Sequence, residues 1–331
     1  MDNIKGDSMG DHSAWSFRIG EKTVSGDRNQ GRNLYMIGAI VGDIAGSRFE
    51  FNNYRKKDFE LFSEECHVTD DSILTLAVAK AIMETCKVIR PLIGKPETGE
   101  KFYVMAEWMA NKYLREIGRK YPECGYGGMF AQWIASEVPK PYNSFGNGAA
   151  MRVSPAGFAA GTEGEAISLA DAVTQVTHNH EEGMKGAEAV AVAVFMARHG
   201  KSKMEIRKRI NNDYYPLDFT IDVIRDAYEF NETCQGTVPQ SIEAFLESTS
   251  FEDAIRIAIS LGGDSDTLAA ITGSVAEAFY GVPDEIRERA LAYLDPYLRG
   301  IYDDWIAFIR DRKENNNKST VPEKENKDNG I

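Results

Sequence analysis

Residues 36–51 read MIGAIVGDIAGSRFEF, and the glycines in this stretch predict how the chain packs. Gly38, Gly42 and Gly46 recur every four residues, so they share one face of a helix. A glycine inside a helix is less favourable than alanine by about 1 kcal/mol. Three glycines on one face therefore indicate that another backbone approaches this helix closely.

Helical periodicity continues on the C-terminal side of this stretch. The charged residues 52–60 and the Gly- and Pro-rich segments 121–128 and 139–148 are typical of loops. Elsewhere the spacing predicts helices over 72–86, 102–117, 129–138, 149–160, 164–177, 181–199, 202–211, 217–231, 241–248, 251–261, 267–281 and 284–312. No segment has the strand–helix alternation that a parallel sheet requires. The sequence predicts an all-α single domain.

The two ends of the chain differ in composition from its middle. Residues 1–34 are polar, with one alternating island from Trp15 through Phe17 to Ile19, which is typical of either a flexible leader or a segment that docks on a partner. Residues 313–331 are rich in Asn, Lys and Glu, so we expect a disordered tail. The compact domain is expected over residues 35–312.

Composition and charge exclude several classes of protein. Hydrophobic residues make up 43% of the 331 residues, and 38 basic against 51 acidic residues give a net charge of -13, which disfavours nucleic acid and anionic membranes as main partners. The four cysteines show no CxxC spacing and are interpreted as reduced thiols. Neither a signal peptide nor an apolar run of membrane-spanning length is visible, so we expect a cytoplasmic location.

Two short acidic stretches are the strongest candidates for a functional site. One is Thr69-Asp70-Asp71, and the other, residues 262–267, reads GGDSDT. Four aspartates gathered in one cleft would repel one another unless cations neutralised them, and hard divalent cations prefer oxygen ligands. The alternative is that both stretches are ordinary helix N-caps. Their joint occurrence, one of them behind a Gly-Gly pair, favours a metal site.

A third candidate is the loop that precedes the helix carrying Arg152. Glycines on either side of Asn147 let backbone N–H groups face an anion, although a plain turn has the same composition. Phe145 would stack on a purine or fill the core. His178 either donates a hydrogen bond to a ligand or is an ordinary satisfied histidine. Neither a P-loop nor a complete dinucleotide fingerprint is present.

Together these motifs resemble the ADP-ribosylglycohydrolase family, which includes the dinitrogenase-reductase activating glycohydrolases. The resemblance covers roughly residues 36–285 and keeps the order of five motifs: Gly42-Asp43-x-x-Gly46-x-x-x-Glu50, Thr69-Asp70-Asp71-Ser72, Gly146-Asn147-Gly148 with Met151-Arg152, Thr177-His178, and residues 262–267 followed by Ala269, Ala270 and Gly273.

That resemblance implies a single compact orthogonal helical bundle with two Mg²⁺ or Mn²⁺ ions in a cleft. The implied metal ligands are Thr69, Asp70, Asp71, Asp264, Asp266 and Thr267. The implied substrate-binding residues are Asn143, Ser144, Phe145, Gly146, Asn147, Gly148 and His178. Glu50, Asp70 and Asp264 are the candidates for catalytic carboxylates that activate water or stabilise an oxocarbenium-like centre.

The reaction that the resemblance implies is hydrolysis of the bond between ADP-ribose and a modified acceptor. We expect arginine on a protein as the acceptor, with serine or small ADP-ribosyl compounds as alternatives. A second hypothesis is an immunity protein whose residues 1–34 block a cognate ADP-ribosyltransferase toxin. A degenerate relative without activity is disfavoured, because every acidic position of the motifs is retained.

Overall fold

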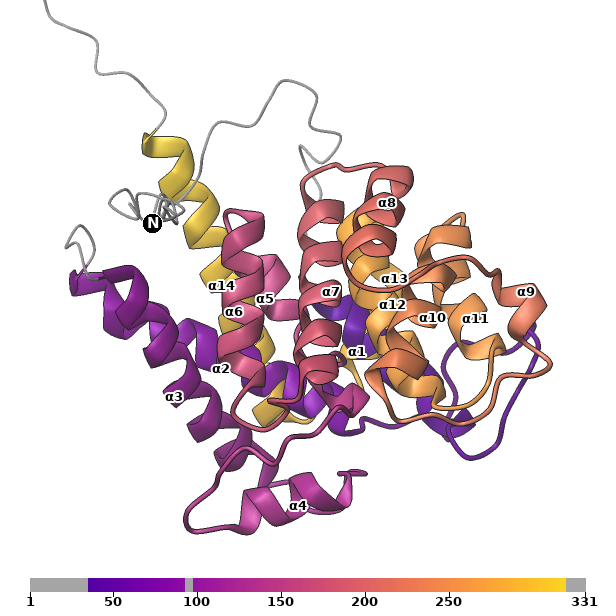
Figure 1. The fold of residues 1–331 in the computed structure, drawn as a ribbon, viewed down its shortest axis with the longest axis horizontal. Coiled ribbons are helices and arrows are strands. Elements are labelled where there is room, and N and C mark those ends of the chain that lie inside the picture. Colours follow the sequence, from indigo (N-terminus) through magenta and orange to yellow (C-terminus); the bar gives the residue numbers. More distant parts are fainter. Residues whose placement is uncertain (1–34, 93–97, 320–331) are drawn as a thin grey trace, which may run out of the picture.

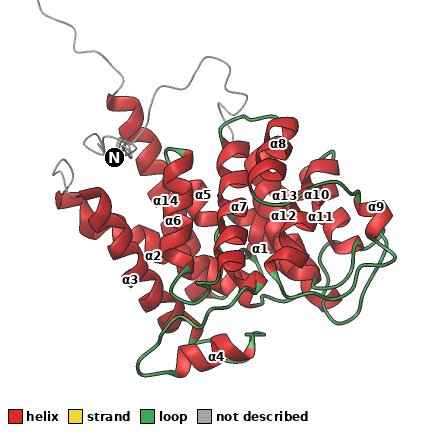
Figure 2. Cartoon of the chain, in the orientation of Figure 1, coloured by secondary structure: helices red, strands yellow, loops and turns green. Residues whose placement is uncertain are grey.

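The computed structural model describes residues 35–92 and 98–319 of the chain, and the regular structure in these ranges is helical (Figure 2). The helices are α1 Ile37–Gly46, α2 Asp70–Ile89, α3 Thr98–Gly118, α4 Gly128–Ala135, α5 Ser154–Ala159, α6 Glu163–Thr174, α7 Glu181–Arg198, α8 Lys203–Asp213, α9 Ile221–Ile224, α10 Cys234–Glu247, α11 Phe251–Ser260, α12 Ser265–Tyr280, α13 Asp284–Leu291 and α14 Pro296–Ser319. Short 3₁₀ turns are η1 Ser47–Phe49, η2 Arg90–Leu92 and η3 Asn147–Ala149. The all-α prediction is confirmed.

Helices α1 and α12 form the centre of the bundle (Figure 1). They run antiparallel, since Gly38 at the start of α1 meets Gly273, while Gly46 at its end meets Asp266. A methyl group added at Gly42 would lie 2.0 Å from the carbonyl oxygen of Ala269. The glycine face predicted from the sequence is therefore the surface on which the backbone of α12 packs.

Four predicted helices differ in the structure, and two of them begin late or are broken. The segment 149–160 forms α5 only from Ser154, where Pro155 suits a helix start. The predicted helix 284–312 is broken into α13 and α14, and the side chain of Asp295 accepts the N–H groups of Tyr297 and Leu298 at the second start.

The predicted helix 217–231 is wrong except for the single turn α9. The carbonyl oxygens of Arg225 and Tyr228 accept hydrogen bonds from the guanidinium of Arg55. A distant side chain thus binds carbonyl groups that a continued helix would pair with its own N–H groups. Helix α10 also starts earlier than predicted, at Cys234 instead of Ser241, and includes Pro239.

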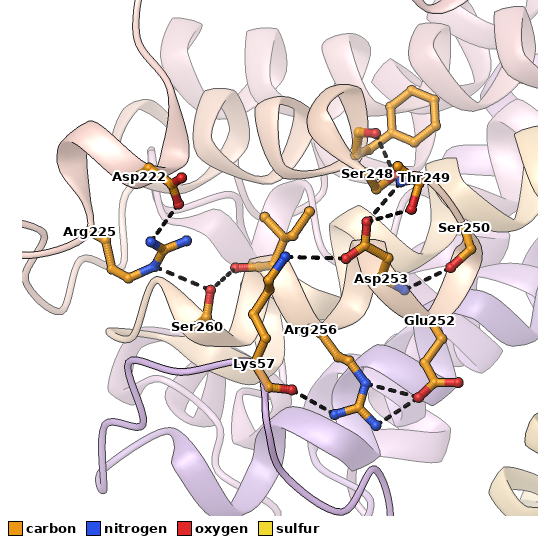
Figure 3. Close-up of polar contacts among 12 residues, drawn as sticks. Lys57, Asp222, Arg225, Ser248, Thr249, Ser250, Glu252, Asp253, Arg256 and Ser260 are labelled. Carbon is orange, nitrogen blue, oxygen red and sulfur yellow. Dashed lines mark hydrogen bonds and ion pairs between the residues drawn. The ribbon is translucent and has the colours of Figure 1, made fainter.

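Polar contacts attach the loop after η1 to α11. The guanidinium of Arg256 donates to the carbonyl oxygens of Lys57, at 2.8 Å, and Phe59, at 2.7 Å, as Figure 3 shows for Lys57. The ammonium of Lys57 lies 3.4 Å from the Asp253 carboxylate. These contacts hold residues 57–59 against α11.

The predicted ends of the domain stay predictions. Residues 1–34, with Trp15 and Phe17, and residues 320–331 lie outside the described residues. Helix α14 continues to Ser319, past the predicted helix end at Arg312. All four cysteines are unpaired. In the described ranges, no helix combines the length and apolar character needed to cross a bilayer.

Candidate active site

The two acidic stretches lie at the first turns of α2 and α12, and the structure brings them together. The hydroxyl of Thr267 donates to Oδ2 of Asp71 at 3.1 Å, although the two residues are 196 positions apart. Carboxylate oxygens of Glu50, Asp264 and Asp266 lie within 4.8 Å of one another. We call Glu50, Asp70, Asp71, Asp264 and Asp266 the acidic cluster.

The N-cap interpretation holds for one stretch only. Thr69 caps α2, because its hydroxyl accepts the N–H of Asp71 at 3.3 Å. Asp264 precedes α12 but its side chain makes no capping hydrogen bond. Gly262 and Gly263 have φ values of 77° and 73°, a backbone conformation that glycine adopts without strain. This turn therefore aims the Asp264 carboxylate at the cluster instead of at its own helix.

Burial and mutual repulsion favour the protonated forms of these carboxyl groups. Burial, followed by the charges of Asp264 and Asp43, raises the pKa of Glu50 to about 7. Burial and the charges of Asp43 and Asp264 raise the pKa of Asp70 to about 8.

The pKa values of the three remaining members of the acidic cluster are also raised. The pKa values of Asp71 and Asp266 are raised well above the usual range by burial and then by neighbouring aspartates. Burial also raises the pKa of Asp264. Positive charge placed among these groups would oppose all five shifts.

Two oxygens of the cluster lack the donors that buried carboxylates normally have. Oδ1 of Asp71 and Oδ1 of Asp266 are buried and accept no hydrogen bond from the described residues. A buried carboxylate oxygen without a partner is strongly unfavourable. Carboxylate and threonine oxygens are the ligands that hard divalent cations prefer. The residues present therefore fit a metal centre.

Asp43 positions the first stretch, a role that the sequence analysis did not assign. Its Oδ1 accepts the Thr69 hydroxyl at 2.6 Å, and its Oδ2 accepts the N–H groups of Thr69 and Ser72, each at 3.1 Å, as well as the Ser72 hydroxyl. The residue is fully buried. Its position between two glycines of an otherwise apolar helix is the signal that could have identified it.

The loop Asn143–Gly148 borders the acidic cluster at Asp264. Nδ2 of Asn147 donates to Oδ2 of Asp264 at 2.6 Å and to the Thr237 hydroxyl at 3.1 Å. The Ser144 hydroxyl accepts the N–H of Gly146 at 3.0 Å. The backbone of Asn143 has a φ of 54°, and its N–H donates to Asn179. The loop is thus held in one conformation next to the acidic cluster.

His178 lies beneath the glycines of this loop. A methyl group added at Gly146 would lie 3.6 Å from Nε2 of His178, and one added at Gly148 would lie 3.4 Å from it. Both glycines therefore bring the backbone close to the ring. Burial and the nearby charge of Arg152 hold the pKa of His178 well below its usual range. Arg152, itself buried, donates to Thr177 at 2.6 Å. His178 is therefore a neutral hydrogen-bonding group, and Arg152 is a second residue to which the sequence analysis gave no role.

Phe145 does not fill the core, because 44% of its surface is exposed. Its ring meets the His180 ring edge-on, with centroids 5.2 Å apart. The loop therefore presents an aromatic face toward solvent beside His178 and the acidic cluster.

Comparisons with known proteins agree with this geometry. The family described as ADP-ribosylglycohydrolase matches residues 30–317. The chain is 25% identical to human ADP-ribosylhydrolase ARH3 over 76% of this chain and 86% of that protein. It is 25% identical to ADP-ribosylarginine hydrolase Tri1 of Pseudomonas putida (strain GB-1), over 75% of this chain and 70% of that protein.

One solved structure shares the fold. It is titled "ADP-ribosylglycohydrolase-related protein complex", and it matches with a TM-score of 0.59 and 22% identity over 85% of this chain and 98% of that chain. At this identity the likeness concerns the fold alone.

Proposed function

The chain belongs to the ADP-ribosylglycohydrolase family, and from this premise we propose that it is a metal-dependent hydrolase that releases ADP-ribose from ADP-ribosylarginine on proteins. The observation that carries the proposal is the acidic cluster, in which two buried oxygens lack donors. The relative named ADP-ribosylarginine hydrolase supports arginine as the acceptor.

We propose that the cluster holds two divalent cations, Mg²⁺ or Mn²⁺. The residues that would hold them are Thr69, Asp70, Asp71, Asp264, Asp266 and Thr267, with Glu50 beside them. When bound, such cations would offset the carboxylate charge and bind ribose hydroxyl oxygens, which fixes the sugar. Asp43 and Asn147 keep Thr69 and Asp264 in place.

Glu50 is the carboxylate best suited to move a proton. Its carboxylate lies beside those of Asp264 and Asp266 but the residue is only half-buried, so a water molecule can reach it next to the proposed cations. In this role Glu50 takes a proton from the water that attacks the anomeric carbon, while the remaining carboxylates stabilise positive charge on that carbon. The bond from the anomeric carbon to the arginine nitrogen breaks, and the proton held by Glu50 passes to the departing guanidine directly or through solvent. Asp70 and Asp264 are the alternative bases.

The loop Asn143–Gly148 and His178 would bind the ADP part of the substrate. Gly146 and Gly148 leave backbone accessible above a neutral imidazole, and Phe145 offers an exposed ring for stacking on a base. These contacts would orient the ribose toward Glu50.

The test is release of ADP-ribose from defined peptides carrying arginine-linked or serine-linked ADP-ribose, with Mg²⁺, Mn²⁺ or a chelator. We expect turnover of the arginine-linked peptide, loss of turnover with chelator, and a drop in kcat of about 10²- to 10⁴-fold in Glu50→Gln. Turnover of the serine-linked peptide alone would contradict the acceptor. Full turnover by Glu50→Gln would remove Glu50 from the chemistry.

The immunity-protein alternative stays a prediction. Trp15 and Phe17, on which it depends, lie outside the described residues. Deletion of residues 1–34 should leave hydrolysis intact and abolish any tight complex with a cognate transferase. Equal binding by the shortened chain would contradict it.

A further inference from the structure

Two phenylalanines form an exposed stack that the proposed chemistry does not use. Phe51 is 85% exposed and Phe230 is 41% exposed. Their ring centroids are 5.9 Å apart, with an angle of 23° between the ring planes. Large aromatic side chains left in water on two separate segments are a marker of a binding surface.

The stack lies at the edge of the acidic cluster. Phe51 directly follows Glu50 in the chain. Phe230 belongs to segment 228–232, whose Tyr228 ring would lie 2.7 Å from a methyl group at Gly263. The carbonyl oxygen of Glu232 accepts the N–H of Asn147 at 2.7 Å. Both phenylalanines therefore come from segments that border the predicted metal ligands.

Side-chain contacts fix the two segments relative to each other. The guanidinium of Arg55 donates to the carbonyl oxygens of Tyr228, at 2.5 Å, and Leu261, at 2.9 Å, and also to that of Arg225. The side chain of Asn53 accepts the N–H of Gly263 at 2.7 Å. The stack is thus pre-organised, which reduces the entropy lost on binding.

The surroundings of the stack are acidic. Glu229 and Glu232 are exposed and form no ion pair within the described residues. The charge of Glu232 acts on both Glu50 and Asp264. Two cations of the neighbouring loop have partners of their own, since Arg55 donates to carbonyl groups and Lys57 pairs with Asp253. An aromatic face with unpaired carboxylates suits a planar cation, and guanidinium is the side chain that both stacks and carries charge.

We propose that Phe51 and Phe230, with the carboxylate of Glu232, bind the guanidinium of the acceptor arginine. This inference rests on the proposed function and deepens it, because it assigns the acceptor side of the site to residues on this chain. The ADP side, from Asn143 to Gly148, borders this acceptor side, since Asn147 donates its N–H to the carbonyl oxygen of Glu232.

The test measures KM and kcat for the arginine-linked peptide in Phe51→Ala, Phe230→Ala and Phe51→Leu, together with calorimetric binding of free ADP-ribose. We expect KM to rise about three- to tenfold in all three variants, since leucine keeps bulk but not the aromatic face. Phe51→Tyr should keep the wild-type KM, and the affinity for free ADP-ribose should not change. Met204→Ala removes a side chain that is 77% exposed on α8 and serves as the control.

Unchanged KM in Phe51→Ala and Phe230→Ala would overturn the inference while the proposed function stands. An equal loss of affinity for free ADP-ribose would assign the stack to the nucleotide and would also overturn it. Absence of wild-type turnover on the arginine-linked peptide would overturn the proposed function and this inference together. The exposed position of both rings means that the variants should fold, which a thermal melt checks.

Discussion

Buried carboxylates lie at both ends of the α1–α12 pair, and the two ends differ in the hydrogen-bond donors that these carboxylates have. At one end, Glu277 is fully buried and accepts the N–H groups of Tyr35 at 2.5 Å and Gly38 at 2.6 Å. At the other end, Oδ1 of Asp71 and Oδ1 of Asp266 are buried without a donor. The described residues supply donors to the first carboxylate and none to these two oxygens of the second set.

This contrast shows that hydrogen-bond donors, and not burial, distinguish a carboxylate with a structural role from a carboxylate of the candidate site. Burial raises the pKa of Glu277 to about 7, and hydrogen bonds from the backbone oppose that rise. Burial also raises the pKa of Asp266, but there the neighbouring charges of Asp264 and Asp71 add to the rise. Burial is thus the main cause of both shifts, but the neighbouring groups oppose the shift at Glu277 and add to it at Asp266.

The largest loss of stability is expected from a substitution in the middle of the contact between α1 and α12. In Gly42→Ala the added methyl group would lie 2.0 Å from the Ala269 carbonyl oxygen, and rigid backbone cannot yield to it. We expect a loss of about 3 kcal/mol or more of unfolding free energy in urea titrations, and loss of activity because both ends shift. Gly300→Ala on α14 is the matched control, since nothing lies within 4 Å of its added methyl group. Equal stability of the two variants would refute the close packing.

The next largest loss of stability is expected at the end of the α1–α12 pair where Glu277 lies. Glu277→Gln places an amide N–H₂ group against backbone donors and should lower the unfolding free energy by about 3 kcal/mol. For an acid whose pKa is raised on folding, the stabilising contribution is complete below about pH 4.5 and is lost as pH rises through about 7. The gap between wild type and variant should therefore be widest near pH 5 and narrow toward pH 8. A gap that widens with pH would contradict the assignment.

The smallest effect on stability is expected at the end of the α1–α12 pair where Asp266 lies. Asp266→Asn removes a charge from the acidic cluster, so at pH 8 without divalent cations its unfolding free energy should rise by up to about 1 kcal/mol. We also expect Mg²⁺ to raise the Tm of the wild type, and to raise it more at pH 8 than at pH 6 because protons compete with the cation, whereas the variant should lose this increase. A stability loss as large as that of Glu277→Gln would erase the distinction between the two ends.

Local signals in the sequence were sufficient for much of the fold. The glycine spacing of α1 predicted a close backbone neighbour, and Thr69 ahead of an apolar run predicted the start of α2. The helix 217–231 failed, because Arg55 binds carbonyl groups there from far along the chain. Asp43 received no role, because its partners Thr69 and Ser72 are distant in sequence.

The sequence by itself determined that the chain is helical, where most of its helices begin, and which oxygen-bearing residues are available. Only the tertiary structure decided that Asp71 and Thr267 touch, that Asp264 faces the cluster instead of capping its helix, and that Phe51 and Phe230 stack. The physical reason is the distance along the chain over which each kind of interaction acts. Backbone hydrogen bonds and side-chain periodicity act over a few residues, whereas the meeting of helix ends depends on how α1 packs against α12.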